Sequence, residues 1–311
     1  MRELTSALVL GGAGFLGSWI VDALADDGVD VVIVDNLTTG RVEHTGTAPL
    51  SIADAGSEVL RGILGSRHFD AVFHVAGPAY VPTSVDRPGE DLAGTVGVTL
   101  AVLEEIRALE RRPLVVYASS AAVYGESRYL PIDEDHPLLP LSPYGVSKLA
   151  AEHYIRIYAS LHGVPAMSLR PFSLYGPRQR KQVVHDLLVR ALQPGEVLTV
   201  AGVPEVSRDL VYVADAARAF VTLARRGAGQ GETYNIATGQ ATTLAELAAA
   251  VVTAAGAAKR VRFTGGARPG DPTTWCGDAS RARALGVELP TELEDGLRRT
   301  AAWLVAEGTA D

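Results

Sequence analysis

The chain has 311 residues, of which 47% are hydrophobic and 21% are charged. This is the composition of a globular protein, and it excludes a disordered chain, a collagen-like repeat and a coiled coil. The length predicts about two domains, or one large α/β unit with an appended lobe. The net charge of −8 speaks against a nucleic acid as a partner.

Two further features restrict the class of protein. The single cysteine, Cys276, excludes an internal disulfide framework and a cysteine-rich zinc module, and it is typical of a reducing cytoplasm. Four glycines interrupt the uncharged stretch at residues 4–21, which is unlike the apolar core of an export signal. No stretch approaches the ~20 apolar residues that cross a bilayer. We therefore expect a soluble cytoplasmic protein with no membrane partner and no metal site.

Short apolar runs and helical segments alternate along the first half of the chain. Residues 7–10, 29–34, 71–75, 114–118 and 164–170 are predicted strands, and residues 15–25, 94–110 and 144–161 are predicted helices. The strand runs are apolar at nearly every position, as expected for strands that are covered on both faces. This alternation predicts an α/β fold with a mainly parallel, doubly wound sheet.

The alternation breaks down after Arg170, where Pro and Gly become frequent. We predict a first domain over residues 1–170 and a smaller lobe over 171–311, with residues 209–240 returning to the first domain as a helix (210–226) and a strand (234–237). Residues 170–270 hold 13 Lys and Arg but seven Asp and Glu, a net charge of +6 that leaves −14 for the rest. A basic lobe on an acidic protein favours an anionic small ligand, with a solvated charged face as the alternative.

A glycine-rich turn follows the first predicted strand. Gly11, Gly14 and Gly17 form Gly-x-x-Gly-x-x-Gly where a strand ends and a helix begins. Such a turn lets a pyrophosphate approach the backbone and the positive end of the helix dipole. Asp35 ends the next strand, 18 residues after Gly17, where a carboxylate accepts hydrogen bonds from the adenosine ribose and repels a 2′-phosphate. The pattern predicts NAD in preference to NADP, although Arg41 nearby weakens that preference, and a simple strand cap is the alternative role for Asp35.

A second motif carries the candidate chemistry. Tyr144 and Lys148 are four residues apart and so share one face of the predicted helix. An ammonium near a phenol favours the phenolate, so we expect the Tyr144 pKa to fall from its usual value towards neutrality. Ser119 and Ser120 follow the strand at 114–118, at the edge of the sheet where open α/β folds bind ligands. Ser120 is the predicted hydrogen-bond donor to a substrate oxygen, whereas Ser119 is interpreted as a strand cap.

Taken together, these motifs resemble the extended short-chain dehydrogenase/reductase family, and more narrowly its NAD-dependent nucleotide-sugar epimerases and dehydratases. The resemblance rests on residues 11–17, 35–37, 74–76, 119–125 and 144–148, and continues through 170–179, 208–213, 234–237 and 268–272. It implies a Rossmann-like doubly wound parallel sheet with a smaller C-terminal substrate-binding lobe, and a nucleotide-diphosphate sugar as substrate.

The resemblance also assigns site residues. It implies that Tyr144 is the acid/base, Lys148 its partner and Ser120 the third catalytic residue, while His74 packs at a strand end. The implied cofactor contacts are Gly11, Gly14, Phe15, Leu16, Gly17, Asp35, Asn36, Ile52, Ala76, Tyr144 and Lys148. The implied substrate contacts are Thr83, Ser84, Ser120, Ser173, Tyr175, Arg178, Gln179, Arg208, Arg268 and Asp271. Relatives usually carry Asn where Ser173 stands, which leaves the identity of the sugar open. They also usually carry Asp where Ser51 stands, at the adenine, and Asn where Asp91 stands.

The residues after Ser120 decide between reactions of this family. Dehydratases carry an Asp-Glu pair there and decarboxylases usually a Glu, whereas this chain has Ala121 and Ala122. We therefore predict a nucleotide-sugar 4-epimerase, which oxidises C4 with NAD and returns hydride to the other face. The alternatives are a 4-ketoreductase, a dehydratase or decarboxylase that uses other residues, and a non-catalytic NAD(H)-binding protein.

The helix at residues 144–161 is apolar nearly all round, so more than one of its faces must be buried. Together with the predicted helix at 94–110 it favours a homodimer through a four-helix interface, and relatives commonly dimerise in this way. Burial under the C-terminal lobe is the alternative.

Overall fold

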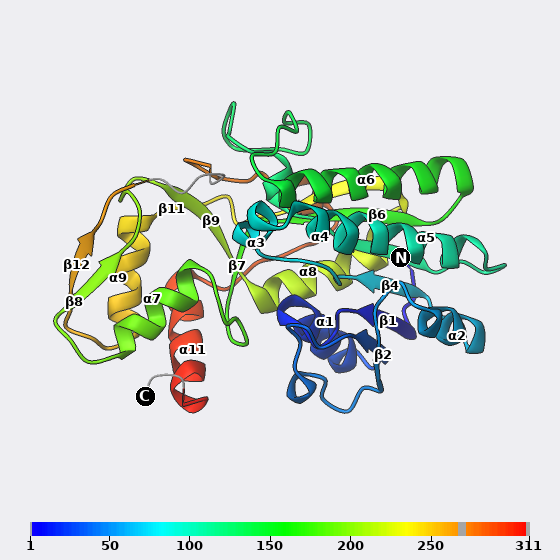
Figure 1. Cartoon of the computed structure of the whole chain (residues 1–311), viewed down its shortest axis with the longest axis horizontal. Coiled ribbons are helices and arrows are strands. Elements are labelled where there is room, and N and C mark those ends of the chain that lie inside the picture. Colours follow the sequence, from blue (N-terminus) through cyan, green and yellow to red (C-terminus); the bar gives the residue numbers. More distant parts are fainter. Residues whose placement is uncertain (1, 267–271, 309–311) are drawn as a thin grey trace.

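The computed structural model describes residues 2–266 and 272–308, and Figure 1 shows a large sheet-containing part beside a smaller lobe. The large part is built on seven strands in the order β10-β6-β5-β4-β1-β2-β3, and every neighbouring pair is parallel. The predicted doubly wound parallel sheet is therefore confirmed. Its strands are β1 (Ser6–Leu10), β2 (Asp30–Asp35), β3 (Leu50–Ile52), β4 (Ala71–His74), β5 (Leu114–Ala118), β6 (Ala166–Pro171) and β10 (Gln230–Ile236).

Helices cover both faces of this sheet, which explains why its strands are continuously apolar. In β1, Ala7 and Val9 point into the core under α1 (Phe15–Asp26) and α8 (Val213–Arg226). Leu8 and Leu10 point into the opposite core, under α2 (Glu58–Ser66), α5 (Val98–Arg107) and α6 (Pro143–His162). Successive side chains of a strand alternate between faces, so both faces must be apolar when both are buried.

Local signals fix the two ends of α6, the helix that carries Tyr144 and Lys148. The Ser142 side chain accepts a hydrogen bond of 3.2 Å from the Gly145 amide, and Pro143 occupies the first turn. Both features favour a helix start. Gly163 ends the helix in the left-handed region, with φ of 63°. This conformation favours glycine, so the residue terminates the helix.

Three short helical segments lie between β4 and α5: α3 (Val81–Asp86), α4 (Pro88–Leu92) and the π-helical turn η2 (Ala93–Gly97). The predicted helix at 94–110 corresponds to η2 and α5. Two 3-10 turns, η1 (Val42–His44) and η3 (Ala121–Val123), follow β2 and β5. The segment from α3 to α5 packs against α6 (Figure 1).

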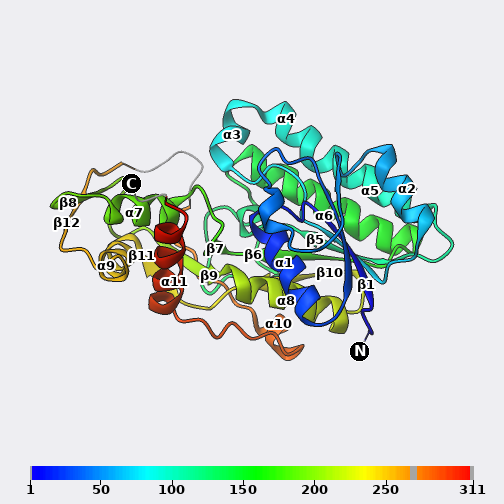
Figure 2. The same cartoon turned by 90° about the horizontal axis from the view of Figure 1, so that it is seen from below.

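The smaller lobe has its own core. Figure 2 shows it beside the large part, with α7 (Val183–Leu192), α9 (Leu244–Ala254) and α11 (Leu293–Ala306) close together. Its strands form two small sheets, one of β7 (Ser173–Tyr175), β9 (Ser207–Tyr212) and β11 (Ala241–Thr243), the other of β8 (Val197–Val200) and β12 (Arg260–Phe263). The short helix α10 (Ser280–Ala284) follows later in the chain.

The prediction of a helix over residues 210–226 is wrong at its start. Residues 210–212 belong to β9, and α8 begins only at Val213. The pairing of β9 with β7 and β11 holds these residues extended. Further along the chain, α8 packs on α1 and β10 pairs with β6 of the main sheet. Within residues 2–266 and 272–308, no helix combines the length and apolar character needed to cross a membrane.

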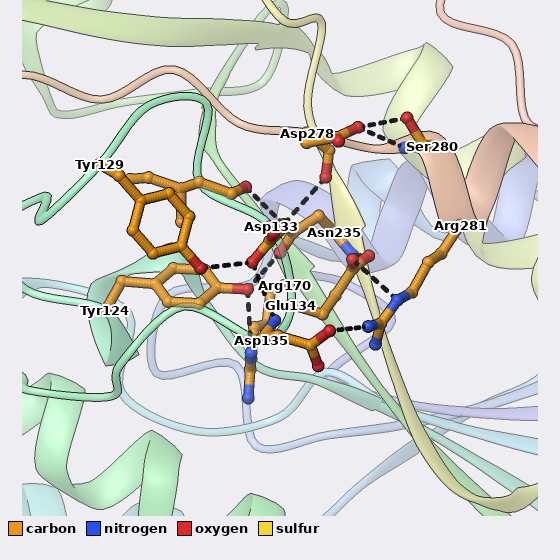
Figure 3. A network of polar contacts seen from close by, with 11 residues as sticks. Tyr124, Tyr129, Asp133, Glu134, Asp135, Arg170, Asn235, Asp278, Ser280 and Arg281 are labelled. Atoms are coloured by element: carbon orange, nitrogen blue, oxygen red, sulfur yellow. Dashed lines mark hydrogen bonds and ion pairs between the residues drawn. The ribbon is translucent and has the colours of Figure 1, made fainter.

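A buried polar network fastens the edge strand β10 to the rest of the sheet (Figure 3). The Arg170 guanidinium donates to both carboxylate oxygens of Glu152 at 2.8 and 2.6 Å, and to the Tyr124 hydroxyl at 2.9 Å. Tyr124 in turn donates to the Asn235 side chain at 2.6 Å. The Glu134 carboxylate accepts the backbone N–H of Asn235 at 2.8 Å, on a strand that has no further neighbour in its sheet. The carboxylate thus satisfies an edge donor that would otherwise lack a partner.

Candidate active site

The glycine-rich turn between β1 and α1 leaves no room for side chains. A Cβ atom at Gly17 would lie 2.0 Å from the Gly11 carbonyl oxygen, and one at Gly11 would lie 2.8 Å from the Ala76 amide nitrogen. Gly14 caps α1 without any side-chain hydrogen bond, so its first N–H groups are available to an anion. Phe15 and Leu16 in the first turn of α1 are partly exposed. These residues fit the pyrophosphate of a dinucleotide.

Asp35 is held at the end of β2 by the turn itself. Its two oxygens accept hydrogen bonds from the amides of Ala13 at 2.9 Å and Leu37 at 2.8 Å, and the residue is 7% exposed. It thus orders the local loop, and a carboxylate retains further lone pairs for ribose hydroxyls. Its register partner on β3, Ile52, is 67% exposed, an apolar side chain left open beside the expected nucleoside. Asn36 donates to Asp54 at 2.8 Å, which orders the same loop.

The three candidate catalytic residues lie together beyond the end of β5. The Tyr144 hydroxyl lies close enough to the side chain of Ser120 to interact with it. Ser120 also accepts a hydrogen bond of 3.1 Å from the Ala122 amide, so its Oγ is fixed at the start of η3. The Lys148 ammonium donates to the Ala118 carbonyl at 2.9 Å and lies 5.8 Å from the centre of the Tyr144 ring. The structure therefore brings the predicted set into one place, with Lys148 5% exposed.

Burial governs the acidity of this pair. Tyr144 is densely surrounded by protein, although part of its surface remains accessible. Burial raises the pKa of its hydroxyl to about 12, and the interaction with Ser120 lowers this pKa in part. Burial lowers the pKa of Lys148 to about 8, and the charges of Asp91 and Glu152 oppose that shift. The expectation was that Lys148 moves the Tyr144 pKa towards neutrality. In the protein without its cofactor the pKa is instead raised, because burial disfavours the charged phenolate.

The comparisons with known proteins agree with this geometry. The family model described as NAD dependent epimerase/dehydratase family matches residues 7–237. The chain belongs to this family.

Relatives in this family define the activity. The UDP-glucose 4-epimerase of Mycolicibacterium smegmatis is 35% identical over 303 residues, which cover 94% of this chain and 96% of that protein. The crystal structure of the Thermotoga maritima UDP-glucose 4-epimerase with UDP-glucose matches with a TM-score of 0.91 and 32% identity, over 97% of this chain and 99% of that one. The Thermus thermophilus UDP-glucose 4-epimerase in complex with NAD matches with a TM-score of 0.87 and 32% identity, over 96% and 99% of the two chains. The predicted NAD-dependent nucleotide-sugar 4-epimerase class and the NAD cofactor are confirmed.

The predicted substrate contacts of this family member fall into two groups. In the first group, only Ser84 has a contact with a catalytic residue among the described interactions: it is buried and accepts the Tyr144 amide at 3.1 Å, and Thr83 beside it is exposed. Ser173 is half-buried at the start of β7. Arg208 is half-buried on β9, with its guanidinium 5.5 Å from the centre of the Trp275 ring. Arg268 and Asp271 lie outside the described residues.

The second group makes contacts within the protein. Tyr175 is 1% exposed in the core of the smaller lobe. The side-chain amide of Gln179, which is 3% exposed, donates to the Leu174 carbonyl at 2.9 Å. Arg178 pairs with Asp22 of α1 at 2.8 Å and stacks over Trp19, so it ties the smaller lobe to the large part. Their contact with the substrate stays a prediction.

Three buried polar residues near the catalytic pair complete the site. His74 contacts Thr99 at 3.0 Å, and burial lowers its pKa to about 3, so the ring is neutral and fits the predicted packing role. Sequence reasoning missed Glu152, although this residue stands one helical turn after Lys148 on the same helix. It noted Asp91 only as a departure from the family and gave it no role, because α4 is too short to show a periodic pattern.

Proposed function

We propose that the enzyme interconverts the C4 epimers of a UDP-hexose. One observation carries this assignment within the family: the side chains of Ser120 and Tyr144 lie close enough to interact, while the two residues after Ser120, Ala121 and Ala122, carry no acid or base. Epimerisation needs a single proton acceptor at the sugar O4, whereas elimination of water or loss of a carboxylate needs further groups. The UDP moiety is supported by the substrates named for similar 4-epimerases.

Each catalytic residue then has a defined task. Tyr144 accepts the O4 proton during oxidation and returns it during reduction, so the protein ends each cycle unchanged. Ser120 donates a hydrogen bond to the same oxygen and holds it near the phenol. Lys148, fixed by the Ala118 carbonyl, presents a positive charge that favours the phenolate. NAD, which the glycine-rich turn and Asp35 would hold, would supply the hydride acceptor that this oxidation at C4 needs.

The test uses the purified enzyme without added reductant. UDP-galactose, UDP-N-acetylgalactosamine and UDP-glucuronic acid are incubated separately, and the products are separated from their C4 epimers. We expect conversion of at least one sugar to its epimer, with no net change in the absorbance of NADH. Consumption of added NADPH with a 4-keto sugar, and no epimer formed in its absence, would instead identify a ketoreductase.

We further propose that a second copy of the chain covers the outer face of α6. Val146, Tyr154, Ile157 and Leu161 along this helix are 40–72% exposed, although all four are large and hydrophobic. A contiguous apolar face of this kind favours association. The smaller lobe lies at the other end of the molecule in Figures 1 and 2, which supports a partner over burial within the chain.

Sedimentation at micromolar concentration tests the dimer. We expect a dimer for the wild type and a monomer for Ile157→Glu, since a charge at the centre of an apolar interface is left without a partner. Glu110→Gln, an exposed change at the end of the helix segment beside α6, is the control and keeps the dimer. A monomeric wild type would contradict this proposal.

We also place the enzyme in the cytoplasm, where its one cysteine remains reduced.

A further inference from the structure

A buried carboxylate lies beside the catalytic pair without a bonding partner. Asp91 on α4 is 3% exposed, and neither of its oxygens has a hydrogen-bond partner in the described part of the chain. Helix α4 packs directly against α6, which carries Tyr144 and Lys148 (Figure 1). An unpaired buried carboxylate destabilises a fold. Groups of this kind are concentrated at functional sites, where their charge serves the chemistry.

The charged groups around Lys148 single out Asp91. Glu152, on the same helix, is bonded through both oxygens to Arg170, so its charge is largely neutralised. His74 of β4 is neutral. The Tyr117 ring of β5 lies 5.0 Å from the Lys148 ammonium and carries no charge. Asp91 is thus the negative charge near the catalytic pair that is not neutralised by a bonded cation within the described residues.

We propose that Asp91 is a positioning residue for the epimerisation, its buried negative charge keeping Lys148 in the ammonium form and setting the pH range in which the enzyme works. This role rests on the proposed function, because it acts through Lys148 and Tyr144 rather than on the sugar.

The sign of the effect follows from the charge. Asp91 raises the pKa of Lys148, which burial brings down to about 8, and it also raises the pKa of Tyr144. Because burial has already lowered its pKa, Lys148 is the group whose loss of a proton we expect to limit activity on the alkaline side. Removing the charge of Asp91 lowers both apparent pKa values of the coupled pair. Both limbs of the pH–rate profile then move to lower pH. A purely structural role would instead lower the rate by the same factor at every pH.

The decisive experiment compares two isosteric changes on α4. Asp91→Asn removes the buried charge, and Glu90→Gln removes the exposed charge beside it. We expect both limbs of the kcat profile to move down by about one pH unit in Asp91→Asn, and to stay in place in Glu90→Gln. An unmoved profile in Asp91→Asn, or a uniform loss of rate at all pH values, would overturn the proposal.

A second measurement does not depend on the substrate. The chain has only three lysines, Lys148, Lys181 and Lys259, so NMR of selectively labelled lysine follows each ammonium separately. We expect the Lys148 titration to move to lower pH in Asp91→Asn while the other two stay unchanged. If the Lys148 titration moves in Asp91→Asn but the wild-type enzyme epimerises no sugar, only the proposed function is contradicted. An unmoved Lys148 titration contradicts the role of Asp91.

Discussion

The polar groups around Tyr124 and those around Lys148 are both buried, yet they are bonded very differently. Around Tyr124, the hydroxyl and the Arg170, Glu152 and Asn235 side chains all have partners at 2.6–2.9 Å. Around Lys148, several buried polar atoms have no hydrogen-bond partner in the described part of the chain: Nδ1 of His74, both carboxylate oxygens of Asp91, Oγ1 of Thr95 and Oγ of Ser119.

This difference separates groups that stabilise the fold from groups that serve the reaction. A buried polar group gains stability only when its bonds are made, and each unmade bond costs about 1–3 kcal/mol. Proteins tolerate such costs where activity requires them. We therefore expect changes around Tyr124 to reduce the free energy of unfolding, and changes around Lys148 to alter the rate or its pH dependence.

Tyr144→Phe gives the largest expected effect, and it acts on the rate. The change keeps the ring and removes only the proton acceptor, so epimerisation should fall about 10³-fold. The free energy of unfolding and the NAD absorbance of the purified protein should stay as in the wild type. Progress curves with the accepted UDP-sugar and urea unfolding measure the two quantities. Turnover within about tenfold of the wild type would assign the proton transfer to another group.

Glu152→Gln gives the second largest expected effect, a loss in the free energy of unfolding. The change leaves the Arg170 charge buried without its carboxylate, which costs about 3–5 kcal/mol in comparable pairs. Urea unfolding should show this loss, and Glu110→Gln at an exposed position should stay within about 0.5 kcal/mol of the wild type. A loss below about 1 kcal/mol for Glu152→Gln would mean that the network does not hold the sheet edge.

Local signals made much of the first half predictable. The glycine turn, the strands β1, β2, β4 and β5 and the helix α6 came within a few residues of their observed bounds, because caps, glycines and apolar runs act over short distances. Ser120, Tyr144 and Lys148 could be placed together because strand ends of a parallel sheet meet at one edge.

Long-range pairing made the rest unpredictable. No local break marks the boundary between β9 and α8, and it depends on strands that lie far away in sequence. The Tyr124–Asn235 bond joins residues 111 positions apart, and the Arg170–Glu152 pair joins two separate elements. The direction of the Tyr144 pKa shift could not be read from the motif, because the motif shows the neighbouring ammonium but not the burial that raises this pKa.

Tyr124→Phe gives the smallest expected effect of the three changes. It tests whether the polar groups around Tyr124 are separate in function from those around Lys148. The hydroxyl accepts from Arg170 and donates to Asn235, so its loss removes two bonds but no charge. Because Arg170 keeps both bonds to Glu152 and the Asn235 side-chain amide still donates to two backbone carbonyls, the expected loss is about 1–2 kcal/mol in urea unfolding. The kcat and its pH profile should match the wild type, although Tyr124 is only four residues from Ser120. A displaced pH profile would show that the bonded network also tunes the catalytic pair, and the two regions would then no longer be separate in function.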